Sequence, residues 1–242
     1  MDIPHTEPLA KSLTAAIHSG DVASLKQLLE ANPRLSTARI RDNKNNGRTL
    51  LHIATDWPGH FPSVAQTIAL LIQAGADPNA AMLGTTPHQE TPLHWAASSN
   101  DVAAIDALLD GGANIEAPGA VFTNGTAMSD AVIFAQWNAA RRLLERGAKT
   151  TLTQSAALGL MDRLTGYFER TPGPPSEEIT AALWHACTGG QRQTAEYALE
   201  KGANLNWIGW DHQTPLDRAQ RSGNAQLVTW LRDQGAKSAR EL

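Results

Sequence analysis

The sequence has very little cysteine, few aromatic residues other than tryptophan, and no excess of positive charge. Its 242 residues include one cysteine, Cys187, so no disulfide can form within the chain, and a reducing compartment is expected. Lysine and arginine number 20 against 24 aspartates and glutamates, which gives a formal net charge of -4. Because nucleic-acid phosphates are usually bound by basic patches, this balance argues against nucleic acid as a partner.

Long apolar runs and the common catalytic motifs are also missing. No window approaches the roughly 20 apolar residues of a membrane span, and residues 1–9 carry two acids and two prolines instead of a signal sequence. We therefore expect no membrane partner and a cytoplasmic location. The sequence contains no nucleophile elbow, phosphate-binding loop or Gly-x-Gly-x-x-Gly motif, and we expect no cofactor.

A seven-residue pattern recurs along the chain. It is clearest at 91–97 (TPLHWAA), 49–55 (TLLHIAT) and 214–220 (TPLDRAQ), and weaker at 126–132 (TAMSDAV) and 181–187 (AALWHAC). A second pattern follows each copy, at 71–77 (LIQAGAD), 108–114 (LLDGGAN), 143–148 (LLERGA), 198–204 (ALEKGAN) and 230–236 (WLRDQGA). Gly202 and Gly235 lie 33 positions apart, and a recurrence near this period is typical of repeat proteins.

The third copy shows what one repeat is expected to form. Thr91 can cap a helix whose first residue is Pro92, where the missing N–H costs nothing. A second helix follows, with apolar residues at helical spacing: Val102, Ile105, Leu108 and Leu109. Gly112 then supplies a left-handed C-terminal cap, and residues 114–124 are expected to form an extended finger that leads to the next repeat.

Thr-Pro-Leu-His-x-Ala-Ala followed by Leu-Leu-x-x-Gly-Ala-Asp/Asn resembles the ankyrin repeat. The resemblance implies an all-α solenoid of helix-turn-helix repeats with projecting fingers, formed by residues 1–242 as a single domain. We predict about seven repeats, at about 10–47, 48–90, 91–125, 126–150, 151–180, 181–213 and 214–242. The fifth is degenerate and runs into residues 171–175 (TPGPP), which favour a rigid turn over a hinge.

An insert in the second repeat is the largest departure from the pattern. The second repeat has five more residues between its two signatures than the third, and the segment at 56–62 reads DWPGHFP. Two prolines and a glycine favour a defined turn. Trp57 and Phe61 either fold back as a small satellite core or, with His60, form a wall of a binding pocket.

Tryptophan usage is the second departure. The chain has seven tryptophans but only four phenylalanines and two tyrosines. Trp95 stands where the family usually has leucine, and Trp184 where it usually has histidine. Trp207 and Trp210 lie in one finger, where packing in a core explains them less well. Clustered exposed aromatic residues are typical of interaction surfaces, so we favour a binding role over packing against the preceding finger.

A polar row on the first helices is the third departure. Asp130 occupies the position that Ile53 and Trp95 occupy in their repeats, and His185 occupies it in the sixth. The resemblance implies that these helices line the concave side, which places Trp95, Asp130 and His185 in one row with Asp56 one turn away. A carboxylate and an imidazole there can bind a polar ligand or move a proton. The alternative, which we favour, is a hydrogen bond from each to a neighbouring loop.

The remaining histidines and the cysteine favour structural roles. His52 and His94 match the histidine of the motif, which the resemblance implies ties adjacent fingers together. His88 and Glu90, near His94, are of ligand type but lack a strong metal-binding spacing, so we expect no metal site. Cys187 occupies a small-residue core position, where a buried, unreactive thiol is expected.

Two classes of function fit these features. The resemblance implies a non-catalytic protein–protein interaction module that uses the concave groove and the fingers, with an unidentified protein as partner. Trp207 and Trp210 would be its anchors, and Trp57 and Phe61 would extend the surface.

The alternative is a small-molecule-binding or catalytic pocket in the groove. It would be built by the 56–61 insert together with Trp95, Asp130, Trp137 and His185. If the pocket is catalytic, the acid or base would be one of Asp130, His185, Asp56 and His60.

Overall fold

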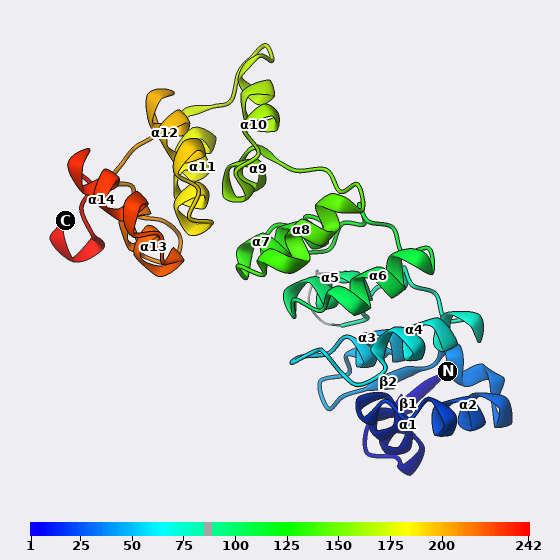
Figure 1. Cartoon of the computed structure of the whole chain (residues 1–242). Coiled ribbons are helices and arrows are strands. Elements are labelled where there is room, and N and C mark those ends of the chain that lie inside the picture. Colours follow the sequence, from blue (N-terminus) through cyan, green and yellow to red (C-terminus); the bar gives the residue numbers. More distant parts are fainter. Residues whose placement is uncertain (85–88) are drawn as a thin grey trace. The chain divides into compact units, whose positions relative to one another are not determined.

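The computed structural model describes residues 1–84 and 89–242 and confirms the predicted all-α solenoid (Figure 1). The described residues contain fourteen α-helices, which follow one another in consecutive pairs. The chain groups into two compact units, Met1–Ala148 and Lys149–Leu242, and each is described by itself. The repeat boundaries, the number of repeats and the single domain remain predictions.

The N-terminal unit, Met1–Ala148, holds four helix pairs. They are α1 (Pro8–Ser19) with α2 (Val22–Ala31), α3 (Leu50–Ala54) with α4 (Val64–Gln73), α5 (Pro92–Ser98) with α6 (Val102–Asp110), and α7 (Ala127–Ile133) with α8 (Trp137–Glu145). A 3-10 helix, η1 (Pro33–Thr37), follows α2. The first helices of neighbouring pairs pack together, as α5 and α7 do, and so do the second helices, as α4 and α6 do. This stacking buries one continuous core.

The finger after the first helix pair forms a small sheet. Its strands are β1 (Asp2–Pro4), β2 (Arg39–Arg41) and β3 (Gly47–Thr49), in the order β1-β2-β3. Strands β2 and β3 are antiparallel, whereas β1 joins β2 in parallel with Ile3 opposite Ile40. Both isoleucines are buried, so the segment before α1 is held in place by the finger.

The repeat motif forms its short helices as the sequence predicts. Pro92 is the first residue of α5 and Thr91 caps it, together with the side chain of His94. Ala96 and Ala97 are fully buried, and these small side chains let the next helix approach closely.

The C-terminal unit, Lys149–Leu242, holds three helix pairs. They are α9 (Leu152–Leu158) with α10 (Met161–Phe168), α11 (Ser176–Thr188) with α12 (Arg192–Glu200), and α13 (Pro215–Ser222) with α14 (Ala225–Asp233), followed by a 3-10 helix, η2 (Ala239–Glu241). Its core includes Leu183, Leu216 and Cys187. Cys187 is fully buried, as its position predicts, and burial raises the pKa of its thiol.

Helix α11 begins earlier than the repeat pattern indicates. The motif places the start of the sixth repeat at Ala181, but the helix begins at Ser176. Pro175 is in the extended conformation at its N-cap, and Glu177 and Glu178 lie in its first turn. Negative side chains are favourable at a helix N-terminus, so this end extends past the motif. The turn at residues 171–175 therefore leads directly into a helix.

Candidate functional site

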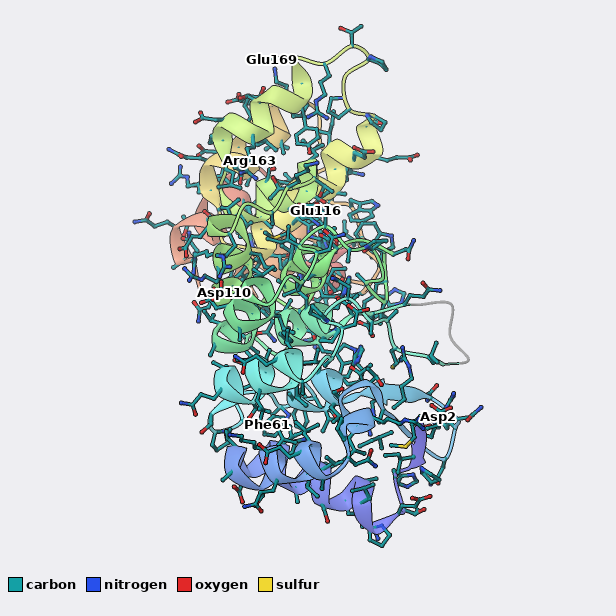
Figure 2. The ribbon with its side chains drawn as sticks, turned by 90° about the vertical axis from the view of Figure 1, so that its right-hand side faces the viewer. Asp2, Phe61, Asp110, Glu116, Arg163 and Glu169 are labelled. Carbon is teal, nitrogen blue, oxygen red and sulfur yellow. The ribbon has the colours of Figure 1, made fainter. Side chains whose placement is uncertain are left out.

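The insert after α3 is fastened to the helix pairs on both sides of it. The ring of Phe61 stacks on that of His18 in α1, with centroids 4.1 Å apart and planes 8° apart (Phe61 is labelled in Figure 2). The backbone N–H of His60 donates to the carboxylate of Asp101 at 2.6 Å, and its ring contacts the Ser99 carbonyl oxygen at 3.1 Å. These contacts favour the packing interpretation for Phe61 and His60.

Asp56 and Trp57, the first two residues of the insert, have different surroundings. Asp56 accepts a hydrogen bond from Arg48 at 2.6 Å and another from the backbone N–H of Trp57 at 2.9 Å. The Asp56 carboxylate therefore forms an ion pair with Arg48. Trp57 is 82% exposed, and it remains available to a binding partner.

Trp95 and Asp130 lie at equivalent positions of α5 and α7 and are linked through Glu90. The indole N–H of Trp95 donates to a Glu90 carboxylate oxygen at 3.2 Å. Asp130 is fully buried, and neither of its side-chain oxygens has a hydrogen-bond partner within the described residues. Burial and, to a smaller extent, the negative charge of Glu90 together raise the pKa of Asp130 to about 8. A carboxyl in this state is mostly protonated at neutral pH.

Two phenylalanines near this position were missed by the sequence reasoning. Phe122, in the finger before α7, and Phe134, at the end of α7, are both exposed, and their ring centroids lie 6.0 Å apart. Serine or glycine stands at the position of Phe134 in several other repeats, as Ser99 and Gly189 show. The phenylalanine at position 134 therefore departs from the repeat pattern, and this departure is visible in the sequence. Trp137, which was predicted to line the groove, is the first residue of α8 and is half-buried.

Four aromatic side chains gather in the C-terminal unit around one finger. We call residues 204–213 the tryptophan finger. The ring of Trp210 meets Trp207 edge to face at 4.9 Å and Trp184 of α11 at 5.9 Å, and His185 lies 6.3 Å away. The structure therefore brings the two predicted finger tryptophans together with the predicted histidine.

The tryptophan finger is fixed to α11 by its backbone. The indole N–H of Trp184 donates to the carbonyl oxygen of Gln213 at 3.1 Å. Gly209 lies so close to this indole that a Cβ there would stand 2.5 Å from the indole nitrogen. Arg218 of α13 covers Trp184 from another side, with its guanidinium carbon 4.4 Å from the ring centroid, and pairs with Asp211 of the finger at 3.1 Å.

His185 offers an unpartnered polar atom beside these rings. Its Nδ1 is buried and has no hydrogen-bond partner within the described part of the chain. Burial lowers the pKa of His185 to about 4, and the positive charge of Arg218 acts in the same direction. The imidazole is therefore neutral at physiological pH. Asp130 and His185 lie in different units, so the row of Trp95, Asp130 and His185 stays a prediction.

Two family models match the chain. One, for ankyrin repeats in three copies, matches residues 65–154, and one for a single ankyrin repeat matches residues 46–82. The chain contains ankyrin repeats. Protein fem-1 homolog A of Rattus norvegicus is 34% identical over 100 residues, which are 38% of this chain and 14% of that relative. Protein fem-1 homolog A of Homo sapiens is 37% identical over 84 residues, 31% of this chain and 12% of that relative.

The similarity to the fem-1 homologues is therefore confined to a short stretch of each relative. The ankyrin chain spans about an eighth of the length of these proteins. Ankyrin repeats are in general modules of protein–protein interaction, and this is the class of function that the family supports.

The motif histidines join consecutive ankyrin repeats. The Nε2 of His52 donates to the Glu90 carbonyl oxygen at 3.1 Å, and that of His94 donates to the Gly125 carbonyl oxygen at 3.3 Å. Burial lowers the pKa of His52 to about 3 and also lowers that of His94. Both imidazoles are neutral structural links, as the resemblance implies.

Neither a metal-ligand cluster nor a membrane-spanning helix is found among the described residues of the ankyrin chain. His88 lies outside the described residues. Within residues 1–84 and 89–242, no group of three or more His, Cys, Asp or Glu side chains is placed to hold a metal ion. In the same residues, no helix combines the length and the apolar character that a membrane span requires.

Proposed function

We propose that this ankyrin-repeat chain is a non-catalytic protein-interaction module and that the tryptophan finger is its main contact surface. The proposal rests on Trp210, whose side chain is 70% exposed although three neighbouring rings hold it in place. Ile208, two residues earlier, is 47% exposed. Covering such apolar surface is favourable, so a protein partner gains binding free energy by seating on it.

The finger is also organised before any partner arrives. Edge-to-face ring contacts and the close approach of Gly209 to Trp184 restrict the side-chain rotamers of the cluster. A surface that is already ordered loses little conformational entropy on binding. Tryptophan is, in addition, the residue type most enriched among the side chains that dominate interface energies.

The partner of this surface is proposed to present an apolar segment. Arg218, the cation nearest the rings, is neutralised by Asp211, and the imidazole of His185 is uncharged. Binding to the finger should therefore depend only weakly on salt concentration. The buried thiol of Cys187 is compatible with the cytoplasmic location that we propose.

A second candidate function is a small-molecule site in the groove of the N-terminal unit. The observation that favours it is Asp130, a buried carboxyl whose two oxygens lack partners, beside Glu90 and Trp95. A polar ligand that supplied hydrogen-bond donors to these oxygens would relieve the cost of leaving them unsatisfied. Catalysis by Asp130, as acid or base, would be a further step of this candidate.

Binding measurements on three variants separate the two candidates. A partner recovered by affinity purification is titrated in calorimetry against the wild type and the double variant Trp207→Ala/Trp210→Ala. We expect the double variant to bind at least about 30-fold more weakly, because it removes two anchors of the interface. Trp230→Ala, the same change on α14, is the matched control and should leave the affinity within about threefold.

The opposite pattern would overturn the finger as the contact surface. If the double variant keeps its affinity while Asp130→Asn loses it, the groove of the N-terminal unit is the binding site. A melting temperature close to that of the wild type, measured for each variant, ensures that lost binding is not lost folding.

A further inference from the structure

A second, chemically different site adjoins the end of the tryptophan finger in the C-terminal unit. A cavity of about 600 Å³ opens between the last residues of the tryptophan finger, α13, α14 and η2. Three arginines line it, Arg221 from α13, Arg232 from α14 and Arg240 from η2, together with His212, Gln213 and Asp217. Its lining is thus polar and rich in guanidinium groups, unlike the aromatic surface of the finger.

Arg221 is held in this cavity by a neutral group. With its amide oxygen turned toward the arginine, Gln213 accepts hydrogen bonds from both terminal nitrogens of Arg221, at 2.8 and 2.9 Å. An amide orients the guanidinium without pairing its charge, and the Asp217 carboxylate interacts with that charge electrostatically. Arginine has five N–H donors in a planar fork, so further donors of Arg221 stay available to an anion.

The other charges of the cavity leave it with an excess of positive charge. Arg232 pairs with Glu241 at 2.7 Å. Asp217 accepts from the backbone N–H of Thr214 and of Ala239, each at 2.9 Å. Arg240 forms no ion pair within the described residues. Three guanidinium groups therefore face two carboxylates, those of Asp217 and Glu241, and both carboxylates already have donors.

We infer that this cavity is an oxyanion site that takes a phosphate or carboxylate group, with Arg221 and Arg240 as the residues that bind it. Charge-assisted hydrogen bonds from guanidinium to such groups are short, directional and often bidentate. The volume is larger than one phosphate needs, so a phosphate or carboxylate attached to a larger molecule also fits. This inference does not depend on the proposed function of the tryptophan finger.

Titration of the full chain with inorganic phosphate tests the site. Amide resonances are followed by heteronuclear NMR, and we expect shifts at His212, Gln213, Arg221 and Ala239 with a Kd on the order of 1 mM. Because the cavity is open to solvent, the affinity should fall as sodium chloride is added. A blocked peptide with one phosphoserine and the same peptide with glutamate in its place form the other two arms.

The three probes distinguish the source of the anion. Much tighter binding of either peptide than of inorganic phosphate assigns the site to a side chain of a protein partner. Equal affinities assign it to a free anion. In both cases the shifts should map to the same residues.

Matched variants show whether the arginines bind the anion directly or only add to the overall positive charge of the protein. Arg221→Gln and Arg240→Gln should each weaken phosphate binding about tenfold, and the double change should abolish it. Arg221→Lys keeps the charge without the fork and should retain an intermediate affinity. Arg141→Gln removes an equal charge from α8 and should change nothing.

Two results would overturn the oxyanion site. One is the absence of shifts at these residues in tens of millimolar phosphate while the protein remains folded. The other is an equal loss of affinity in Arg221→Gln and Arg141→Gln, which would reduce the effect to overall charge. Both results leave the tryptophan finger untouched, because its partner binding is measured separately.

Discussion

Replacing Gly189 with alanine is expected to destabilise the C-terminal unit by about 3 kcal/mol. Gly189 follows α11, and a Cβ there would overlap the carbonyl oxygen of Ala157 in α9 and stand 2.8 Å from its carbonyl carbon. These atoms belong to the backbone, so the clash is relieved only if α11 moves away from α9. The two helices share the core of this unit, and such a shift would loosen it.

A second glycine in the same unit provides the matched control. Gly166 lies within α10, and a Cβ there would meet nothing within 4 Å. Gly166→Ala should therefore stabilise the unit by about 0.5–1 kcal/mol through higher helix propensity. Urea unfolding of both variants checks the pair. Equal unfolding midpoints for Gly189→Ala and the wild type would show that α9 and α11 are not packed as closely as described.

When Asp130 is replaced by asparagine, the difference in unfolding free energy between the variant and the wild type is expected to shift in favour of the variant as the pH rises. The pKa of Asp130 is raised to about 8 in the folded chain, so the folded state retains a proton that the unfolded state loses above about pH 4. The contribution of protonated Asp130 to the unfolding free energy of the wild type is fully present below about pH 4. It is lost progressively as the pH rises toward 8. Asparagine carries no charge at any of these pH values.

The size of the effect follows from the proton linkage. Between about pH 5.5 and pH 8, the difference in unfolding free energy between Asp130→Asn and the wild type should change by about 3 kcal/mol in favour of the variant. The buried imidazoles of His52 and His185, whose pKa values are lowered, reduce stability as the pH falls below about 6.5. They are present in both proteins, so their contribution cancels in the comparison.

Melting temperatures across this pH range provide the measurement. Asp110→Asn, which removes an exposed carboxylate from the same unit, is the control and should show a small effect at every pH, because exposed charges contribute little. A constant difference between Asp130→Asn and the wild type would mean that the Asp130 carboxyl is solvated or paired in the folded protein.

The regular part of the fold is predictable because each ankyrin repeat carries its own local signals. Thr91 and Pro92 mark a helix start, and α5 begins there. The equivalence of Trp95, Asp130 and His185 follows from counting along the motif. That equivalence holds even in the sixth repeat, where α11 starts five residues before the motif. The extra residues are all at the start of the helix, so the motif keeps its usual place at the end of it.

The surroundings of the candidate residues depend on contacts between positions that are distant in the sequence, and the repeat motif does not predict such contacts. Phe61 stacks on His18, and His60 bonds to Asp101, about 40 positions away in each case. Our preferred sequence interpretation of Asp130, a hydrogen bond to a loop, is not what the described residues show, because both oxygens lack partners. A repeat pattern fixes the position of a side chain but not the polar groups that meet it.

The proposed contact surface is tested most directly by photocrosslinking in cells. A benzophenone amino acid is placed singly at Trp210 and Ile208 in the tryptophan finger, at Thr229 on α14 of the same unit, and at Lys26 on α2. Crosslinks to one and the same protein from positions 210 and 208, with none from 229 or 26, are the predicted result. Crosslinks to that protein from 229 or 26, with none from 210 and 208, would contradict the tryptophan finger as the surface by which this ankyrin-repeat chain binds its partner.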